Sequence, residues 1–191
     1  MPLRASEGTF VVLERPSSRT DLLSGDHLLS VPLHYVEESN WCWAACAVMV
    51  ARYYGDGFIQ QCMLADYLFG QTNCCSTPSA FVCNKGALSE LVCTLYQGAC
   101  ALQCHGQNGD ISLASIQFEI DQGRPIQCNF DWSVGGSHTV IVRGYYESPT
   151  PLYGYVHVND PLEGEGAITY EDLQSAYGLG VWNYTYYDLK K

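Results

Sequence analysis

The apolar residues of this 191-residue chain change their spacing near Gly123. Before that glycine they recur every three or four residues, which is the period of amphipathic helices. After it, runs of Val, Ile, Tyr and Thr are bounded by Gly, Pro and Asp, which is typical of strands. Because the helical segments come first and the strands second, the sequence predicts an α+β domain with an antiparallel sheet.

Individual helices and strands follow from the same pattern. The predicted helices cover residues 39–55, 58–69, 86–97, 113–122 and 170–177, and the predicted strands cover residues 125–132, 138–146, 153–159 and 181–189. We expect Ser39 or Asn40 to cap the first helix, because short polar side chains accept hydrogen bonds from its first N–H groups. Gly55 is expected to end it, since glycine readily adopts the left-handed conformation.

The first thirty residues differ from the rest of the chain. Residues 1–30 are polar and rich in turn-forming residues, except for a short apolar run at residues 10–13 that we expect to pair as an edge strand. We interpret residues 1–30 as an N-terminal arm or propeptide remnant and residues 31–191 as one domain. We expect neither a classical signal peptide nor a membrane span, because no apolar run approaches about 18 residues.

The net charge narrows the classes of partner. Nine Lys and Arg residues against 20 Asp and Glu residues give a net charge of −11. Nucleic-acid-binding domains usually carry a basic face and many peripheral membrane proteins carry a polybasic segment, so neither class fits. With 47% hydrophobic and 15% charged residues, the chain is expected to fold, and we expect a monomer.

All ten cysteines lie between Cys42 and Cys128. This density favours an oxidising destination, so we expect a secreted or exported protein. Two or more disulfides are expected within one crowded loop, among Cys62, Cys74, Cys75 and Cys83. Four cysteines allow three pairings, and the sequence leaves the choice open. The paired C-x-x-C spacing of structural zinc sites is absent, so no metal or other cofactor is predicted.

Cys42 is the sharpest candidate for chemistry. It stands in the first turn of a predicted helix, where the positive end of the helix dipole and unpaired N–H groups favour a thiolate, the nucleophilic form. The alternative is that Cys42 is a buried or disulfide-bonded thiol, like its companions. Cys46, one turn further on, is expected to be a buried free thiol.

A thiolate nucleophile needs a base and a group that orients the base. His138 is the base candidate, because it follows Gly-Gly-Ser at residues 135–137 and starts an apolar strand. His157 alternates within a strand and is interpreted as a structural residue of the sheet. Asp160, at the end of the next strand, is the orienting candidate, with Asn159 as the alternative.

The segments SNWCWAAC, GGSHTVIVRGYY and VHVNDP, in this order, resemble the papain-like cysteine peptidases of bacterial type. The similarity is to the branch of AvrRpt2-like effector proteases and C39-like peptidases, and it spans residues 31–182. It implies a papain-like fold with a helical lobe and a sheet lobe. It also implies a nucleophile at Cys42, a base at His138, an orienting carboxylate at Asp160 and a peptide or protein substrate.

The chain departs from this family at one position. The family commonly places a Gln about six residues before the nucleophile as an oxyanion-hole donor, and here that position is Val36. The loss of such a donor costs about 10²–10³ in rate. The backbone N–H of Cys42 is one remaining donor. We expect the Asn40 side chain or the His34 imidazole to supply the second.

Three classes of function remain open at this stage. The first is a cysteine peptidase that forms a thioester acyl-enzyme. The second is an acyltransferase, deamidase or cyclase that uses the same triad, because the covalent step is shared. The third is a catalytically silent peptide-binding module, which the missing Gln keeps open.

Overall fold

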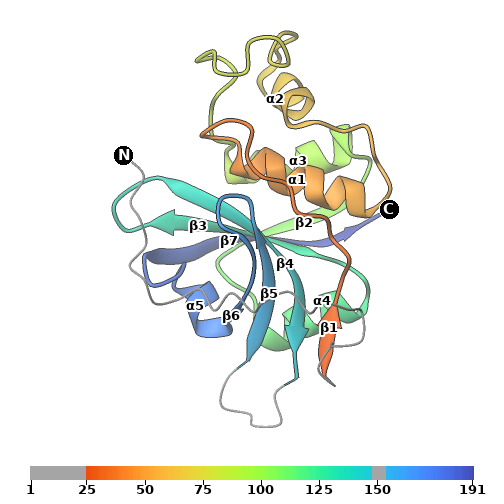
Figure 1. Cartoon of the computed structure of the whole chain (residues 1–191), viewed down its shortest axis with the longest axis vertical. Helices are drawn as coiled ribbons and strands as arrows, with labels where there is room; N and C mark the ends of the chain where they lie inside the picture. The colour runs from red at the N-terminus through yellow and green to blue at the C-terminus, as the bar shows by residue number, and fades with distance from the viewer. Residues whose placement is uncertain (1–24, 148–153) are drawn as a thin grey trace.

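The computed structural model describes residues 25–147 and 154–191, and it contains a helical lobe and a sheet lobe (Figure 1). The helical lobe, residues 36–99, contains α1 (Cys42–Tyr53), α2 (Gln61–Phe69) and α3 (Ser89–Ala99). The sheet lobe contains α4 (Leu113–Asp121), α5 (Tyr170–Gln174) and the strands. The strand expected at residues 10–13 lies outside the described residues. The predicted α+β class is confirmed.

Every neighbouring strand in the described sheet is antiparallel. The strands are β1 (Asp26–Leu28), β2 (Gln103–Asn108), β3 (Ile126–Trp132), β4 (Ser137–Tyr146), β5 (Tyr155–Asp160), β6 (Gly164–Thr169) and β7 (Gly180–Lys190). Their order is β2-β7-β3-β4-β5-β6, and β1 pairs with the last residues of β4. β1 lies inside the arm predicted for residues 1–30, so the boundary at residue 30 stays a prediction.

Three strands were not among those predicted. β1 and β2 carry few apolar residues, so their sequences show no strand pattern. They are stabilised by hydrogen bonds to β4 and β7. β6 also has a short, weakly apolar sequence, and its backbone pairs with that of β5.

The start of α1 also differs from expectation. Trp41 is the N-cap residue and no side chain caps the helix, so the prediction of a Ser39 or Asn40 cap is wrong. The side chains of both residues instead hydrogen bond with Asn84. Gly55 follows the helix with a φ of 92°, as expected for the residue that ends it.

The two faces of the sheet bury separate cores. On β4, Ile141 faces α1 and belongs to the core of the helical lobe. Its neighbours Val140 and Val142 point to the opposite face and pack with Ile116 and Leu173 of α4 and α5. This alternation is the period-two pattern of a strand buried on both faces.

Three disulfides cross-link the described residues. Cys62–Cys75 and Cys74–Cys83 lie in the helical lobe, which selects one of the three pairings that the sequence left open. A third disulfide, Cys93–Cys104, joins α3 to β2. Cys46 is buried and free, as expected.

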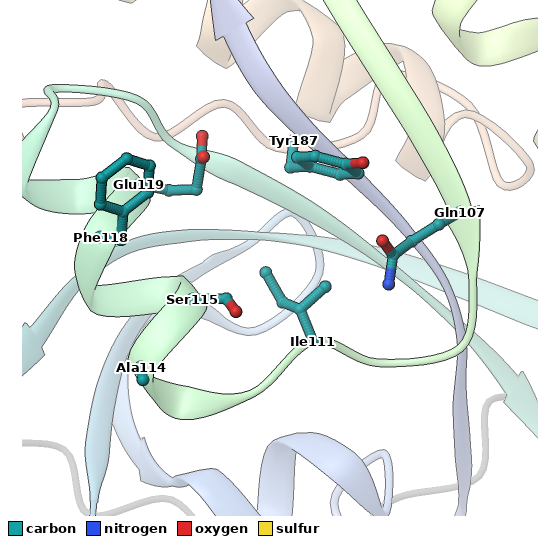
Figure 2. Close-up of a pocket in the computed structure, with 7 residues that line it drawn as sticks. All are labelled: Gln107, Ile111, Ala114, Ser115, Phe118, Glu119 and Tyr187. Carbon is teal, nitrogen blue, oxygen red and sulfur yellow. The ribbon is translucent and has the colours of Figure 1, made fainter.

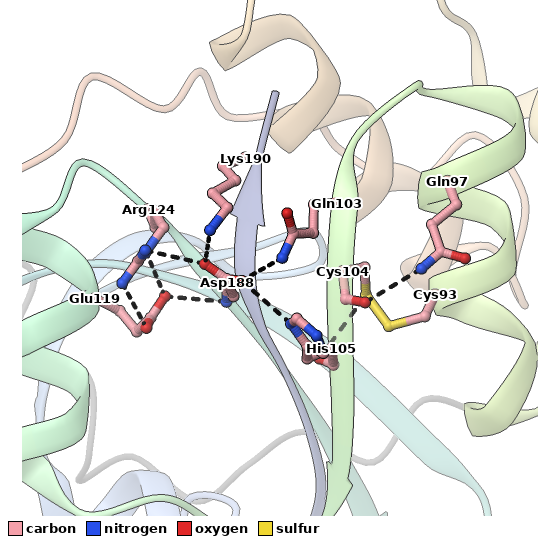
Figure 3. Close-up of polar contacts among 9 residues, drawn as sticks. All are labelled: Cys93, Gln97, Gln103, Cys104, His105, Glu119, Arg124, Asp188 and Lys190. Atoms are coloured by element: carbon pink, nitrogen blue, oxygen red, sulfur yellow. Dashed lines mark hydrogen bonds and ion pairs between the residues drawn. A yellow bond between two sulfur atoms is a disulfide. The ribbon is translucent and has the colours of Figure 1, made fainter.

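An ion-pair cluster surrounds Asp188 near the C-terminal end of β7 (Figure 3). Arg124 binds Glu119 of α4 through two nitrogens at 2.9 Å each and Asp188 of β7 through a third at 2.9 Å. His105 of β2 also contacts Asp188, at 3.2 Å. The cluster therefore ties α4 and β2 to one strand. No helix in the described ranges is long and apolar enough to cross a bilayer.

Candidate active site

Cys42 is the first residue of α1 and borders a hollow of about 240 Å³ between the two lobes. The helical-lobe wall consists of Ser39, Asn40, Cys42, Trp43, Gly86, Ala87 and Val92. The opposite wall consists of Asn129, Trp132, Gly136, Ser137, Thr139 and Tyr186. Cys42 is a partly exposed free thiol, unlike the buried free thiols Cys46, Cys100 and Cys128. A substrate can therefore reach this thiol from the hollow.

The structure brings the three predicted residues of the triad together. His138 begins the apolar part of β4 and Asp160 ends β5, and the two strands are antiparallel neighbours. His138 Nε2 lies 2.9 Å from Asp160 Oδ1, and both side chains are almost fully buried. Cys42 also acts on the imidazole, because it is among the groups that raise the pKa of His138. The imidazole is therefore paired with a carboxylate and influenced by a thiol.

His138 and Asp160 each stabilise the charged form of the other. Burial by itself would lower the pKa of His138, but its interactions with Asp160 and Cys42 raise it to about 10. Burial would raise the pKa of Asp160, yet the bond to His138 and two backbone N–H groups lower it. His138 is therefore charged at neutral pH and Asp160 is a carboxylate.

The Asp160 carboxylate is held by more than His138. Its Oδ1 also accepts the backbone N–H groups of Leu162 at 2.8 Å and Glu163 at 3.2 Å. Its Oδ2 accepts the hydroxyl of Tyr177 at 3.0 Å. No local sequence pattern pointed to Tyr177, because this residue follows α5 and reaches Asp160 only through the tertiary fold.

Aromatic side chains shield the imidazole from solvent. Trp132 of β3 stacks on His138 with ring centroids 5.7 Å apart and planes 14° apart. Phe130 lies on the same strand, 6.5 Å from the imidazole centroid, and packs edge to face with Tyr177. Cys42 Sγ itself lies 3.9 Å from Thr139 Oγ1. The imidazole is therefore enclosed on the sheet side, and of the three candidate residues Cys42 borders the hollow.

The alternative residues lie elsewhere. Asn159 points to the other face of β5 and donates its amide to the carbonyl of Val31 at 3.0 Å. His157 pairs with Asp26 of β1 at 3.0 Å, which fits its interpretation as a structural residue. Because side chains alternate along a strand, Asp160 and Asn159 cannot both face His138.

The two oxyanion-hole candidates are placed differently. Asn40 lines the same hollow as Cys42, and its Nδ2 donates one hydrogen bond to the carbonyl of Asn84. His34 does not line this hollow. Burial lowers the pKa of His34, and so does Arg52, which lies in the last turn of α1 at the end opposite Cys42. The geometry therefore favours Asn40 over His34 as the second donor.

A second hollow, of about 370 Å³, lies between α4 and the strands β2 and β7 (Figure 2). Ile111, Phe118 and Tyr187 provide its apolar walls. Its one carboxylate, Glu119, is already paired with Arg124. The hollow therefore offers no free nucleophile or base, and the smaller hollow at Cys42 is the candidate active site.

Solved structures share this architecture at low identity. A structure reported for the mite allergens Blo t 1 and Der p 1 is 14% identical, with a TM-score of 0.55 over 87% of this chain and 68% of that chain. UfSP from C. elegans is 12% identical, with a TM-score of 0.47 over 88% of this chain and 34% of that one. The Pseudomonas avirulence protein AvrPphB is 8% identical, with a TM-score of 0.42 over 85% and 98%.

Of these three likenesses, the one to the mite allergen structure is close enough to identify the fold, which is papain-like. No curated protein matches the chain in sequence. The model of the Peptidase_C39 like family matches residues 28–189, a range that includes Cys42, His138 and Asp160. The chain therefore belongs to the Peptidase_C39-like family of papain-like cysteine peptidases.

Proposed function

We propose that this protein is a cysteine peptidase in which Cys42, His138 and Asp160 form the catalytic triad. The observation that carries the proposal is the imidazole of His138, whose Nε2 lies 2.9 Å from Asp160 Oδ1 and whose pKa is raised by both Asp160 and Cys42. A nucleophile, a base and an orienting group in that order match the general pattern of nucleophilic catalysis.

Acylation begins from a thiolate–imidazolium pair of Cys42 and His138, in which His138 already carries the proton. The thiolate attacks the carbonyl carbon of a peptide bond and forms a tetrahedral oxyanion. The oxyanion collapses as the carbon–nitrogen bond breaks, and His138 gives its proton to the departing amine. Asp160 keeps the imidazole in the required orientation and stabilises its positive charge, and a thioester remains on Cys42.

Deacylation uses the same groups with water. His138 takes a proton from a water molecule, the hydroxide attacks the thioester, and the carbon–sulfur bond breaks to release the acid. If an amine attacks instead, the same intermediate gives acyl transfer or cyclisation. If the substrate is a side-chain amide, the same two steps give deamidation. These activities are the second candidates, because they require no change in the triad.

We infer the environment in which the protein acts from its disulfides, and its oligomeric state from the origin of the three triad residues. Three disulfides in the described residues favour an extracellular environment, so we include secretion in the proposal. One chain supplies the nucleophile, the base and the orienting group. The proposed active unit is therefore a monomer that acts on a peptide or protein.

Covalent labelling tests the proposal directly. The protein is treated with a peptide that carries a thiol-reactive group, and the mass of the intact protein is measured. We expect one adduct in the wild type and in Cys46→Ala, and none in Cys42→Ser. Peptide hydrolysis in the presence and absence of an added amine then separates hydrolysis from acyl transfer. A folded wild type that gains no adduct would favour the silent binding module.

A further inference from the structure

The segment before Cys42 is held by one asparagine rather than by regular structure. Asn84 Nδ2 donates to Glu38 Oε2 at 3.2 Å and lies 3.1 Å from Ser39 Oγ. Asn84 Oδ1 accepts the backbone N–H of Asn40 at 3.1 Å, and the Asn84 carbonyl accepts Asn40 Nδ2 at 3.2 Å. Asn84 thus contacts three consecutive residues that lead into the nucleophile, and Ser79 Oγ adds a hydrogen bond of 2.7 Å to Glu38 Oε1.

The neighbours of Asn84 extend these contacts to both sides of Cys42. The indole N–H of Trp41 donates to the carbonyl of Cys83 at 2.9 Å. The indole N–H of Trp43 donates to the carbonyl of Lys85 at 3.0 Å. Both indoles are buried, so each bond satisfies a donor that has lost contact with water. Residues 83–85 therefore form a template against which residues 38–43 are aligned.

A disulfide fixes the template itself. Cys83 is bonded to Cys74, and neither residue is exposed. The backbone N–H of Cys74 donates to Asp66 of α2 at 2.9 Å, so the disulfide connects the template to a helix. The stretch between α2 and α3 contains no other helix or strand. The position of Asn84 consequently depends on this covalent link.

We propose that Asn84 is a positioning residue of the active site, which orients Asn40 as an oxyanion-hole donor and is itself held by the Cys74–Cys83 disulfide. The proposal rests on the proposed peptidase function. A side-chain amide carries two N–H bonds. Asn84 accepts one of those of Asn40 and leaves the second for an oxyanion beside Cys42, in the hollow that Asn40 and Cys42 share.

This arrangement would replace the oxyanion donor that the family's Gln supplies before the nucleophile. Val36 cannot donate a hydrogen bond through its side chain, so another amide has to be aimed at the oxyanion. Asn40 precedes Cys42 by two residues and has no helix or strand to orient it. Loss of one oxyanion donor costs about 10²–10³ in rate, so loss of its alignment alone is expected to cost about 10–10².

The test compares Asn84→Ala with Asn73→Ala, an exposed asparagine of the same loop whose backbone carbonyl makes its loop contacts. We expect Asn84→Ala to lower kcat by about 10- to 100-fold with KM changed by less than about twofold. The rate at which iodoacetamide alkylates Cys42 should stay unchanged, because that displacement forms no oxyanion. Asn73→Ala should match the wild type in all three measurements.

A matched pair of disulfide variants tests the second part of the proposal. Removal of Cys74–Cys83 by a double substitution to serine should reproduce the kcat loss of Asn84→Ala. Removal of Cys62–Cys75 in the same way leaves the template attached and should affect kcat much less. Circular dichroism and thermal melting identify any variant that fails to fold, and Asn84→Ala keeps the proposal testable if the cysteine variants do.

The outcomes separate the two proposals. Wild-type turnover together with a wild-type kcat in Asn84→Ala would overturn this inference alone. Equal losses of kcat and of Cys42 alkylation in Asn84→Ala would also overturn it, because they would show a structural role only. A wild type that hydrolyses no peptide and gains no adduct at Cys42 would overturn the peptidase function, and this inference with it.

Discussion

The helical lobe and the sheet lobe are stabilised by different means. The helical lobe has three short helices, and the long connection between α2 and α3 is closed by the Cys62–Cys75 and Cys74–Cys83 disulfides. In the sheet lobe, hydrogen-bonded neighbours hold the strands in register. Cys128, at the centre of that sheet, is buried and stays a free thiol. Hydrogen bonds between strands thus stabilise the sheet lobe, whereas two disulfides stabilise the long connection of the helical lobe.

This difference matters because the site draws on both lobes. Cys42 comes from the lobe that depends on disulfides, whereas His138 and Asp160 come from paired strands. The alignment of the nucleophile is therefore sensitive to the loop chemistry, and the alignment of the base is sensitive to strand register. Variants that act on one lobe at a time can separate these two dependences.

The largest effect is expected when the thiol of Cys42, in the helical lobe, is replaced. Cys42→Ser should lower kcat/KM by roughly 10⁴–10⁶, because the nucleophile is lost while the fold is kept. Steady-state hydrolysis of a peptide substrate measures this change. Cys46→Ala, one turn further along α1, serves as the control and should retain hydrolysis. Activity in Cys42→Ser would place the nucleophile elsewhere.

The next effect concerns charge in the sheet lobe. Because the pKa of His138 is raised from 6.5 to about 10, its positive charge stabilises the folded protein fully below pH 6.5. This contribution is lost as the pH rises through about 10. Asp160→Asn keeps an acceptor for His138 but removes the carboxylate charge, so we expect the pKa of His138 to fall.

The pH profile of kcat/KM measures that fall. In the wild type the basic limb should lie near pH 10, where His138 loses the proton that it gives to the leaving amine. In Asp160→Asn the limb should move to lower pH. An unmoved limb would show that Asp160 does not set the charge of the imidazole.

Reduction of the disulfides should destabilise the helical lobe more than the sheet lobe. Each disulfide that closes a loop of roughly ten residues is expected to contribute about 3 kcal/mol to the free energy of unfolding. Reduction should therefore raise amide hydrogen exchange in α2 and in residues 70–88 before it affects β3 and β4. Exchange measured by mass spectrometry with and without reductant checks this order. Uniform loosening of both lobes would contradict the comparison.

The smallest effect concerns the support of Asp160. Tyr177→Phe removes a hydrogen bond to a carboxylate and should cost about 1.5–3 kcal/mol of stability, with a several-fold loss of kcat. Tyr53→Phe is the matched control, because the Tyr53 hydroxyl donates to the neutral carbonyl of Gly123 at 3.1 Å. It should cost about 0.5–1.5 kcal/mol and leave kcat unchanged. Urea unfolding and hydrolysis rates provide both quantities.

The elements that the sequence predicted well are those with strong internal patterns. The helix at Cys42 and the strands at His138 and before Asp160 carry enough apolar periodicity to be recognised alone. β2 and β6 carry little, since their stability comes from partners distant in the chain. The capping prediction failed for a related reason, because Asn84 competes for the polar side chains before Cys42.

The amino-acid sequence by itself determined the class of fold, the crowding of cysteines in one loop and the identity of the candidate nucleophile, base and carboxylate. Local patterns encode these features, because periodicity and helix starts depend on neighbouring residues. The tertiary structure decided which cysteines pair, which face of β5 meets His138, and that Tyr177 and Asn84 support the site. These contacts join residues far apart in the chain, and only packing brings them within hydrogen-bond distance.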